Sequence, residues 1–151
     1  MAAPPSLRQL LVTERQAVLA TLSARRAGWP FASVAPYALD ADGQPLLLLS
    51  ELAEHTRNLR ADPRASLLVQ ESSALDDPQA GGRVTLLGKL EQTGDEQARS
   101  AYVARHPQAA EYLMLGDFRM WRLNVSEARY VNGFGDMGWL EGKTLRAALA
   151  G

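Results

Sequence analysis

Hydrophobic residues occur along this chain in short runs that are separated by polar turns. The runs are rich in apolar and β-branched residues, and Gly, Pro, Asp or Ser bounds most of them, which is typical of β-strands. They cover residues 17–22, 31–39, 45–50, 65–70, 83–91, 118–125 and 128–131. No regular alternation of strands with long helices accompanies them, so we expect antiparallel pairing.

Helical spacing is found in fewer places. Leu7, Leu10 and Leu11 follow a Ser-x-x-Gln sequence that begins at Ser6, and this predicts a first helix with a capping box. Further helices are predicted over residues 51–60, from a cap at Thr93 or Asp95 through Arg105, from Pro107 through Leu115, and with a frayed end over 140–150. These segments are too few and too short to form a helical core.

Glycine and proline positions refine the strand prediction. Pro36 lacks an amide donor, so we expect it at a sheet edge, at a bulge or beside a ligand. Gly88 lies inside a strand pattern and indicates a bulge. We interpret residues 71–82 as a loop, 126–127 as a break between two strands, and 132–138 as the end of regular structure.

The elements together predict a mainly β, α+β fold: an antiparallel barrel of six to seven strands with short helices at its ends. Residues 1–151 are expected to form a single domain, with 1–5 and 141–151 as flexible ends. We find no internal repeat and no second domain.

Composition narrows the function classes. The net charge of −1 argues against a nucleic-acid wrapper, and the absence of cysteine excludes disulfides, thiolate metal sites and cysteine nucleophiles. The longest apolar run, residues 46–49, is far shorter than the roughly 20 residues that span a bilayer. The N-terminus lacks an export signal. We therefore expect a cytoplasmic protein that contacts no membrane.

Common catalytic and nucleotide-binding motifs are missing. The two histidines, His55 and His106, belong to no His-x-x-x-His or Glu-x-x-His pair, so we expect no dedicated metal centre. Neither Ser33 nor Ser50 lies in a Gly-x-Ser-x-Gly elbow, which disfavours a hydrolase. Rossmann and P-loop glycine patterns are also absent. A cofactor, if one binds, needs a different scaffold.

The most informative stretch is LSELAEHTRN (49–58), where an apolar strand gives way to a helix. Helix N-terminal amides and the side chains of Ser50, His55, Thr56 and Arg57 are suited to donating hydrogen bonds to an anion. A dianionic phosphate there would raise the pKa of His55 above its ordinary value of about 6.5. The alternative is an ordinary solvent-exposed helix with polar decoration.

A family resemblance rests on several motifs in a fixed order. The segments GWPFASVAPY (28–37), DADG (40–43), LSELAEHTRNL (49–59) and DPRASLL (62–68) resemble the pyridoxamine-phosphate-oxidase-like FMN-binding split barrels. The later segments RVTLLG (83–88), RHP (105–107), DF (117–118) and YVNGFG (130–135) are similar to the haem-utilisation, HugZ-type branch. The resemblance covers about residues 6–140 and implies a split β-barrel.

The resemblance also implies a homodimer with two FMN sites at the interface, each contacted by both chains. Carried over by position, the flavin ring and ribityl chain would lie along Ser33, Val34, Ala35 and Pro36. The phosphate end would be surrounded by Ser50, His55, Thr56 and Asn58. The partner chain would reach the flavin with Arg83, and Val131, Asn132 and Gly133 would lie near its ring.

Two departures from the family patterns affect the expected activity. No Arg-x-His motif follows Gly133, which disfavours vitamin B6 oxidation. The haem-degrading relatives carry a further C-terminal region or a tail histidine, and the sequence given has neither, which puts haem oxygenase activity in doubt. His106 is available as a haem ligand in principle, although its place before Pro107 favours a structural role.

The leading hypothesis is therefore an FMN-dependent oxidoreductase that acts on a small substrate as a homodimer. The sequence assigns no catalytic residue, because the flavin would supply the redox chemistry. A haem-binding or haem-degrading HugZ-like protein is the alternative, as is a non-catalytic flavin or haem carrier. A dimerisation domain without a ligand ranks last, and the choice between FMN and a deazaflavin such as F420 stays open.

Overall fold

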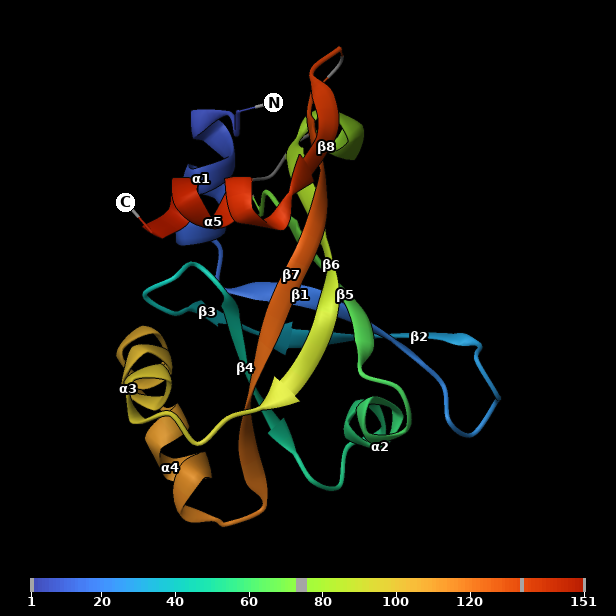
Figure 1. The fold of residues 1–151 in the computed structure, drawn as a ribbon, viewed down its shortest axis with the longest axis vertical. Coiled ribbons are helices and arrows are strands. Elements are labelled where there is room, and N and C mark those ends of the chain that lie inside the picture. The colour runs from blue at the N-terminus through green and yellow to red at the C-terminus, as the bar shows by residue number, and fades with distance from the viewer. Residues whose placement is uncertain (1, 73–75, 134, 151) are drawn as a thin grey trace.

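The structure, a computed structural model, describes residues 2–72, 76–133 and 135–150 (Figure 1). Its helices are α1 (Pro5–Thr13), α2 (Glu54–Ala61), the 3-10 turn η1 (Pro78–Ala80), α3 (Glu96–Arg105), α4 (Ala109–Met114) and α5 (Gly142–Ala150). Its strands are β1 (Gln16–Leu22), β2 (Pro30–Pro36), β3 (Ala38–Leu39), β4 (Pro45–Ser50), β5 (Arg64–Gln70), β6 (Gly82–Gln92), β7 (Phe118–Asn132) and β8 (Met137–Glu141). None of the described helices is long and apolar enough to cross a membrane.

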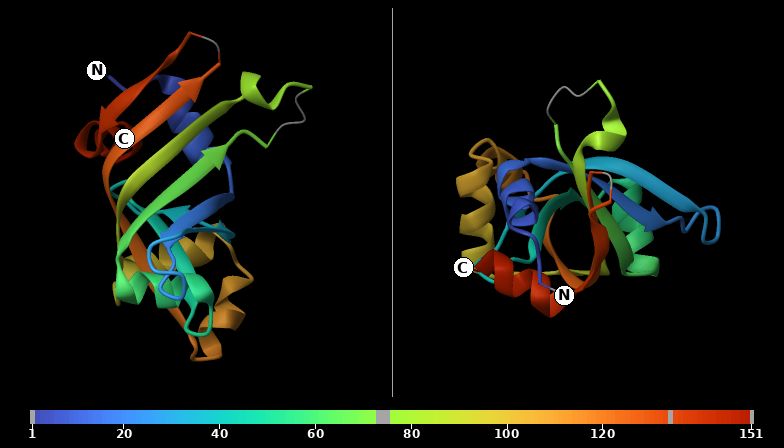
Figure 2. Two further views of the ribbon diagram at one scale, coloured as in Figure 1. Left: turned by 90° about the vertical axis from the view of Figure 1, so that its right-hand side faces the viewer. Right: turned by 90° about the horizontal axis from the view of Figure 1, so that it is seen from above.

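The eight strands of the described residues belong to one sheet, in the order β2-β1-β5-β6-β7-β4-β3, with β8 paired to the C-terminal part of β7. Every pairing is antiparallel. Seen from above, the sheet curls into a partly closed barrel (Figure 2), and β2 and β3 lie at the two ends of the main strand order. This arrangement confirms the predicted antiparallel split barrel with short flanking helices.

The helices cover the open parts of the barrel (Figure 1). Helices α1 and α5 lie at the end that carries both termini, α3 and α4 lie beside β4 at the other end, and α2 lies below β1. In the part of the chain that the structure describes, a core cluster of 22 buried residues fills the barrel interior and includes Leu19, Leu47, Leu67, Leu86 and Leu123. A smaller cluster under α3 and α4 includes Tyr102 and Met120.

Two predictions from glycine and proline are confirmed. The register of β6 on β7 shifts between Leu87 and Gly88, which is the predicted bulge. A Cβ atom at Gly88 would lie 2.1 Å from the carbonyl oxygen of Asn124, so only glycine fits there. Pro36 ends the edge strand β2 and pairs with Gln16 on one side only, where its missing amide leaves no ladder bond unmade.

The C-terminal part of the chain differs from the prediction. Strand β7 runs through residues 126–127 without a break, because β6 on one side and β8 on the other pair with it there. Residues 132–138 include the β7–β8 turn and the start of β8, and Gly133 and Gly135 adopt positive φ in that turn. Helix α5 buries Leu145 and Leu149, so residues 142–150 pack on the core where a loose end was expected.

The start of α1 also differs. The first helix is present, but its N-cap is Pro4 and no side chain caps it, so the capping box predicted at Ser6 does not form. The predicted cap at Asp95 is confirmed, since its Oδ1 accepts a hydrogen bond of 3.0 Å from the Gln97 amide. Proline at the first turn substitutes for a side-chain cap in α1, because its φ is already helical.

Candidate functional site

The edge strand β2 and the first turn of α2 place a serine and a histidine in contact. Ser33 Oγ and His55 Nδ1 are 3.1 Å apart, and both side chains are half-buried. Within the described part of the chain, no partner is found for the second ring nitrogen of His55, Nε2. Burial lowers the pKa of His55 in the protein alone, which favours the neutral ring. The rise that a bound phosphate would cause stays a prediction.

The other polar side chains of this junction have partners within the chain. Thr56 is fully buried and its Oγ1 donates to the Ser50 carbonyl oxygen at 2.6 Å. Asn58, also fully buried, donates from Nδ2 to Thr21 Oγ1 at 3.0 Å and accepts from the Ala24 amide at 2.9 Å. These contacts fasten α2 to β4 and to the β1–β2 hairpin. They do not fit the expectation that Thr56 and Asn58 surround a phosphate.

Ser50 itself is half-buried at the end of β4. Its Oγ accepts a hydrogen bond of 3.1 Å from the Leu52 amide, which shapes the turn between β4 and α2. Of the four residues predicted at the phosphate end, the structure thus places three in internal hydrogen bonds and leaves one ring nitrogen of His55 without a partner. The hydrogen bonds at the turn between β4 and α2 hold His55 in place, and they leave few free donors for an anion.

Replacing Asn58 with alanine tests this interpretation. We expect N58A to unfold about 1–3 kcal/mol more easily than the wild type, because it leaves the Ala24 amide and Thr21 hydroxyl without their partner. Chemical denaturation followed by circular dichroism measures the difference. Asn124, which is half-buried on β7, provides a control position, and equal stability of N58A and N124A would contradict the role assigned to Asn58.

Three predicted site residues lie on the outer face of the sheet. Val34, Arg83 and Val131 occupy positions whose side chains point away from the barrel interior, since their chain neighbours Ala35, Val84 and Tyr130 are buried. Direct cross-strand pairing links one row over six strands: Val34, Val18, Leu68, Thr85, Arg129 and Trp139. We call this row, together with Arg83 and Val131, the outer face.

The outer face is apolar over its β2, β1 and β5 part and ends in an aromatic side chain. Val34 is 65% exposed and Trp139 is 52% exposed, and the Arg129 guanidinium lies 5.7 Å from the centre of the Trp139 ring. Val18 and Leu68 between them are partly exposed, and an apolar area of this kind on a sheet surface is characteristic of an interaction surface. Val18, Leu68 and Arg129 were not predicted as functional residues from the sequence. The alternation of side chains within residues 16–22 and 64–70 was the sequence signal that could have placed Val18 and Leu68 on the outer face.

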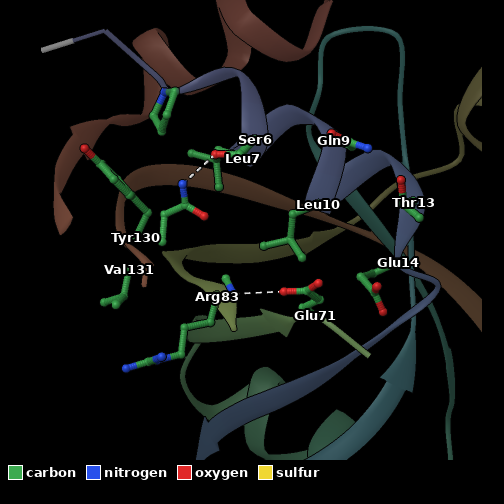
Figure 3. A pocket seen from close by; sticks show the side chains of 13 residues that line it. Ser6, Leu7, Gln9, Leu10, Thr13, Glu14, Glu71, Arg83, Tyr130 and Val131 are labelled. Carbon is green, nitrogen blue, oxygen red and sulfur yellow. Dashed lines mark hydrogen bonds between the residues drawn. The ribbon is translucent and has the colours of Figure 1, made fainter. Parts of the chain in front are cut away.

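A pocket of about 360 Å³ lies between α1 and the ends of β6 and β7 (Figure 3). Arg83, Val131 and Asn132 are among its lining residues, and Asn132 Nδ2 donates to Ser6 Oγ at 2.9 Å. The guanidinium of Arg83 points away from Glu71 and instead donates to the carbonyl oxygens of Gln79 and Gly81. The carboxylates of Glu14 and Glu71 line the pocket, while the Arg83 guanidinium is bonded elsewhere, and this disfavours an anionic ligand there.

Within one chain, the predicted site residues on β2 are separate from those on β6 and at the end of β7. β1 and β5 lie between β2, which carries Ser33 and Val34, and β6, which carries Arg83. Asn132 and Gly133 shape the β7–β8 turn, where the Asn132 amide donates to the Asp136 carbonyl oxygen at 2.7 Å. Within one chain the two groups therefore do not form a single site.

The second histidine has a structural place. His106 is 5% exposed, its Nε2 is 2.7 Å from the Tyr37 carbonyl oxygen, and its ring centre is 4.8 Å from that of Tyr102. Arg105 beside it donates to the carbonyl oxygens of Val12 and Thr13 at the end of α1. These contacts join α3 to β3 and α1, and they give buried His106 a structural role.

The strand order, the partly closed sheet and the flanking helices define a split β-barrel of the pyridoxamine-phosphate-oxidase type. More specifically, the chain belongs to the CREG β-barrel family, whose sequence profile matches residues 2–145. Homologues of the haem-utilisation type confirm the branch that the sequence motifs indicated.

Three relatives illustrate this membership. A chloroplastic protein of Arabidopsis thaliana named non-canonical heme oxygenase HOZ is 40% identical over 119 residues, which are 77% of this chain and 36% of that protein. Heme oxygenase HutZ of Vibrio cholerae is 26% identical over 148 residues, covering 93% of this chain and 82% of HutZ. A heme binding protein of Mycobacterium smegmatis superposes with a TM-score of 0.86 and 35% identity, covering 97% of this chain and 62% of that one.

Proposed function

We propose that this protein binds haem at a surface formed by two copies of the chain. The observation that carries the proposal is the outer face, where an apolar area lies on the same sheet surface as Arg83. Haem is a flat apolar ring with two anionic propionates, so it needs an apolar wall together with a cation such as arginine. The names of three relatives, two heme oxygenases and a heme binding protein, support the same ligand.

The occupant we propose for the rest of the outer face is a second copy of the chain. A two-fold interface places the same patch on both partners. Arg129 and Glu127 lie two residues apart on β7, so Arg129 of one copy is able to pair with Glu127 of the other. Face-to-face packing of two such sheets buries Val34, Val18 and Leu68 of both copies. It also allows Arg83 of one copy to approach β2 of the other, which a single chain cannot achieve.

Haem takes the place of the FMN expected from the sequence. The relatives' names specify haem. Thr56 and Asn58 were expected at a flavin phosphate, but their side chains form hydrogen bonds within the protein. The split barrel itself does not decide between the two ligands, because one fold accommodates different functional sites. The predicted small-molecule ligand is retained, and its identity changes.

A parallel titration of the purified protein with haemin and with FMN tests the proposal. We expect haemin to give a saturable Soret band and to quench the fluorescence of the exposed Trp29 and Trp139, with FMN at least 10-fold weaker. FMN that saturates the protein while haemin binds no better than to an unrelated control protein would contradict it. An oligomer that saturates at one haem per chain would match the proposed pair of sites.

Breakdown of the bound haem is a second candidate function. The two curated relatives are named heme oxygenases, although this chain spans 36% of one of them. Such a reaction needs oxygen and an external reductant, so the test supplies both to the haem-loaded protein and records loss of the Soret band and release of carbon monoxide. Haem that stays intact under these conditions would indicate a storage or delivery protein.

A further inference from the structure

Arg129 on β7 is a half-buried cation without a hydrogen-bonding partner. It forms no hydrogen bond or ion pair with any residue that the structure describes, and its guanidinium lies 5.7 Å from the centre of the Trp139 ring. A guanidinium has five N–H donors, and partial burial without partners costs free energy. The other half-buried arginines of the described residues all donate hydrogen bonds within the chain: Arg83, Arg105, Arg122 and Arg146.

Exposed apolar side chains lie beside Arg129 on the outer face. Trp139 is its direct cross-strand neighbour on β8, and Met137, two residues earlier on β8, pairs with Val131. Met137 is 46% exposed and Trp139 is 52% exposed. Residues two apart on a strand share one face of the sheet, so these three apolar side chains lie together next to the guanidinium. We call Val131, Met137 and Trp139 the β8 wall.

We propose that Arg129 binds a propionate of the haem and that the haem ring lies against the β8 wall. This inference rests on the proposed haem binding, and it assigns the end of the outer face at which haem lies. A carboxylate matches the planar fork of a guanidinium and accepts two hydrogen bonds from it. The acidic edge of haem then contacts the cation, and its apolar ring contacts the wall beside that cation.

Arg83 provides a cation for the second propionate. It pairs with Val131 while Thr85 pairs with Arg129, so the two arginines are diagonal neighbours on β6 and β7. The Arg83 guanidinium already donates to the carbonyl oxygens of Gln79 and Gly81. Arg129 has no such bonds, so we expect it to contribute more to haem affinity.

The position assigned to haem leaves the apolar area on β2, β1 and β5 for the second copy of the chain. Along the row of paired residues, Thr85 separates Arg129 from Leu68 and from the strands beyond it. Pairing of Arg129 with Glu127 of the other copy is compatible with a bound propionate. The donors of a guanidinium lie on more than one edge, so it is able to bind two carboxylates at once.

Haemin and haemin dimethyl ester test the role of Arg129, because the ester lacks both propionate charges. We expect R129Q to bind haemin about 10-fold or more weakly than the wild type and to bind the ester equally well. W139A should bind both compounds more weakly, since it removes part of the β8 wall. Titrations followed at the Soret band measure these affinities.

Another arginine–tryptophan pair provides matched controls. The Arg26 guanidinium lies 4.4 Å from the centre of the Trp29 ring, and Trp29 is 61% exposed. This pair lies between β1 and β2, outside the outer face. R26Q and W29A should therefore bind haemin and its ester as the wild type does.

The outcomes separate this inference from the proposed function. R129Q with wild-type affinity for haemin would overturn the role of Arg129 and leave haem binding intact. Equal losses for haemin and the ester would also overturn it, because Arg129 would then act on something other than a propionate. W139A with wild-type affinity for both compounds would overturn the contact with the β8 wall. A wild type that binds no haemin would overturn the proposed function as well. Thermal unfolding followed by circular dichroism shows whether each variant is folded.

Discussion

Replacing Val34 with glutamate is expected to yield a monomer that binds haem about 100-fold more weakly than the wild type. Val34 is 65% exposed in the single chain and faces outward from β2 toward the proposed partner. A carboxylate placed there lies inside an apolar interface without a partner, and burying such a charge costs several kcal/mol. Light scattering and haem titration measure the two effects.

Val12 offers a matched control for this substitution. It is 44% exposed, it lies on α1, and it does not belong to the outer face. V12E adds the same charge in a comparable environment and should leave both the oligomeric state and the haem affinity unchanged. V34E that remains a dimer with wild-type haem affinity would show that the outer face is not the interface.

The second large effect is expected for Gly88→Ala, which should destabilise the fold by about 3 kcal/mol or more. A Cβ atom there would meet the Asn124 carbonyl oxygen at 2.1 Å and the Asn124 carbonyl carbon at 2.9 Å. Both are backbone atoms of β7, so a side chain cannot rotate away and the β6–β7 pairing has to shift. The free energy of unfolding from chemical denaturation measures the loss.

Gly94 provides the comparison for Gly88. A Cβ atom at Gly94 would meet no atom within 4 Å, and its φ is not positive, so G94A should have nearly the stability of the wild type. If G88A and G94A unfold at the same denaturant concentration, the bulge does not require glycine and this account of the β6–β7 register is incorrect.

The strands were predictable where the local pattern and the final pairing agree. Residues 17–22, 45–50 and 83–91 alternate or cluster apolar side chains, and these side chains fill the barrel. β8 was not predicted, because its residues become a strand only by pairing with β7 across a glycine turn. The continuity of β7 through residues 126–127 likewise depends on neighbours on both sides.

The sequence predicted which residues belong to the candidate site better than it predicted what each of them does. Ser33 and His55 were both selected from the sequence, but their contact joins residues 22 positions apart and depends on how α2 packs below β1. Thr56 and Asn58 look like exposed polar residues of a surface helix. The structure turns them inward, where they form the hydrogen bonds that hold α2.

The ligand was harder to predict than the fold for a physical reason. Haem and FMN are both flat ring systems with anionic groups, and motifs that specify the barrel strands are compatible with either. What distinguishes them is a ligand for iron or a set of donors for phosphate. The internal hydrogen bonds of Thr56 and Asn58 leave fewer donors for a phosphate.

Native mass spectrometry of the protein, purified without added cofactor from cells with an ample haem supply, shows whether two chains hold haem between them. The method weighs the intact assembly together with whatever small molecule it has retained. We expect the mass of two chains with bound haem. A single chain without a ligand, or two chains that carry FMN, would contradict the proposal that two copies of this barrel bind haem between them.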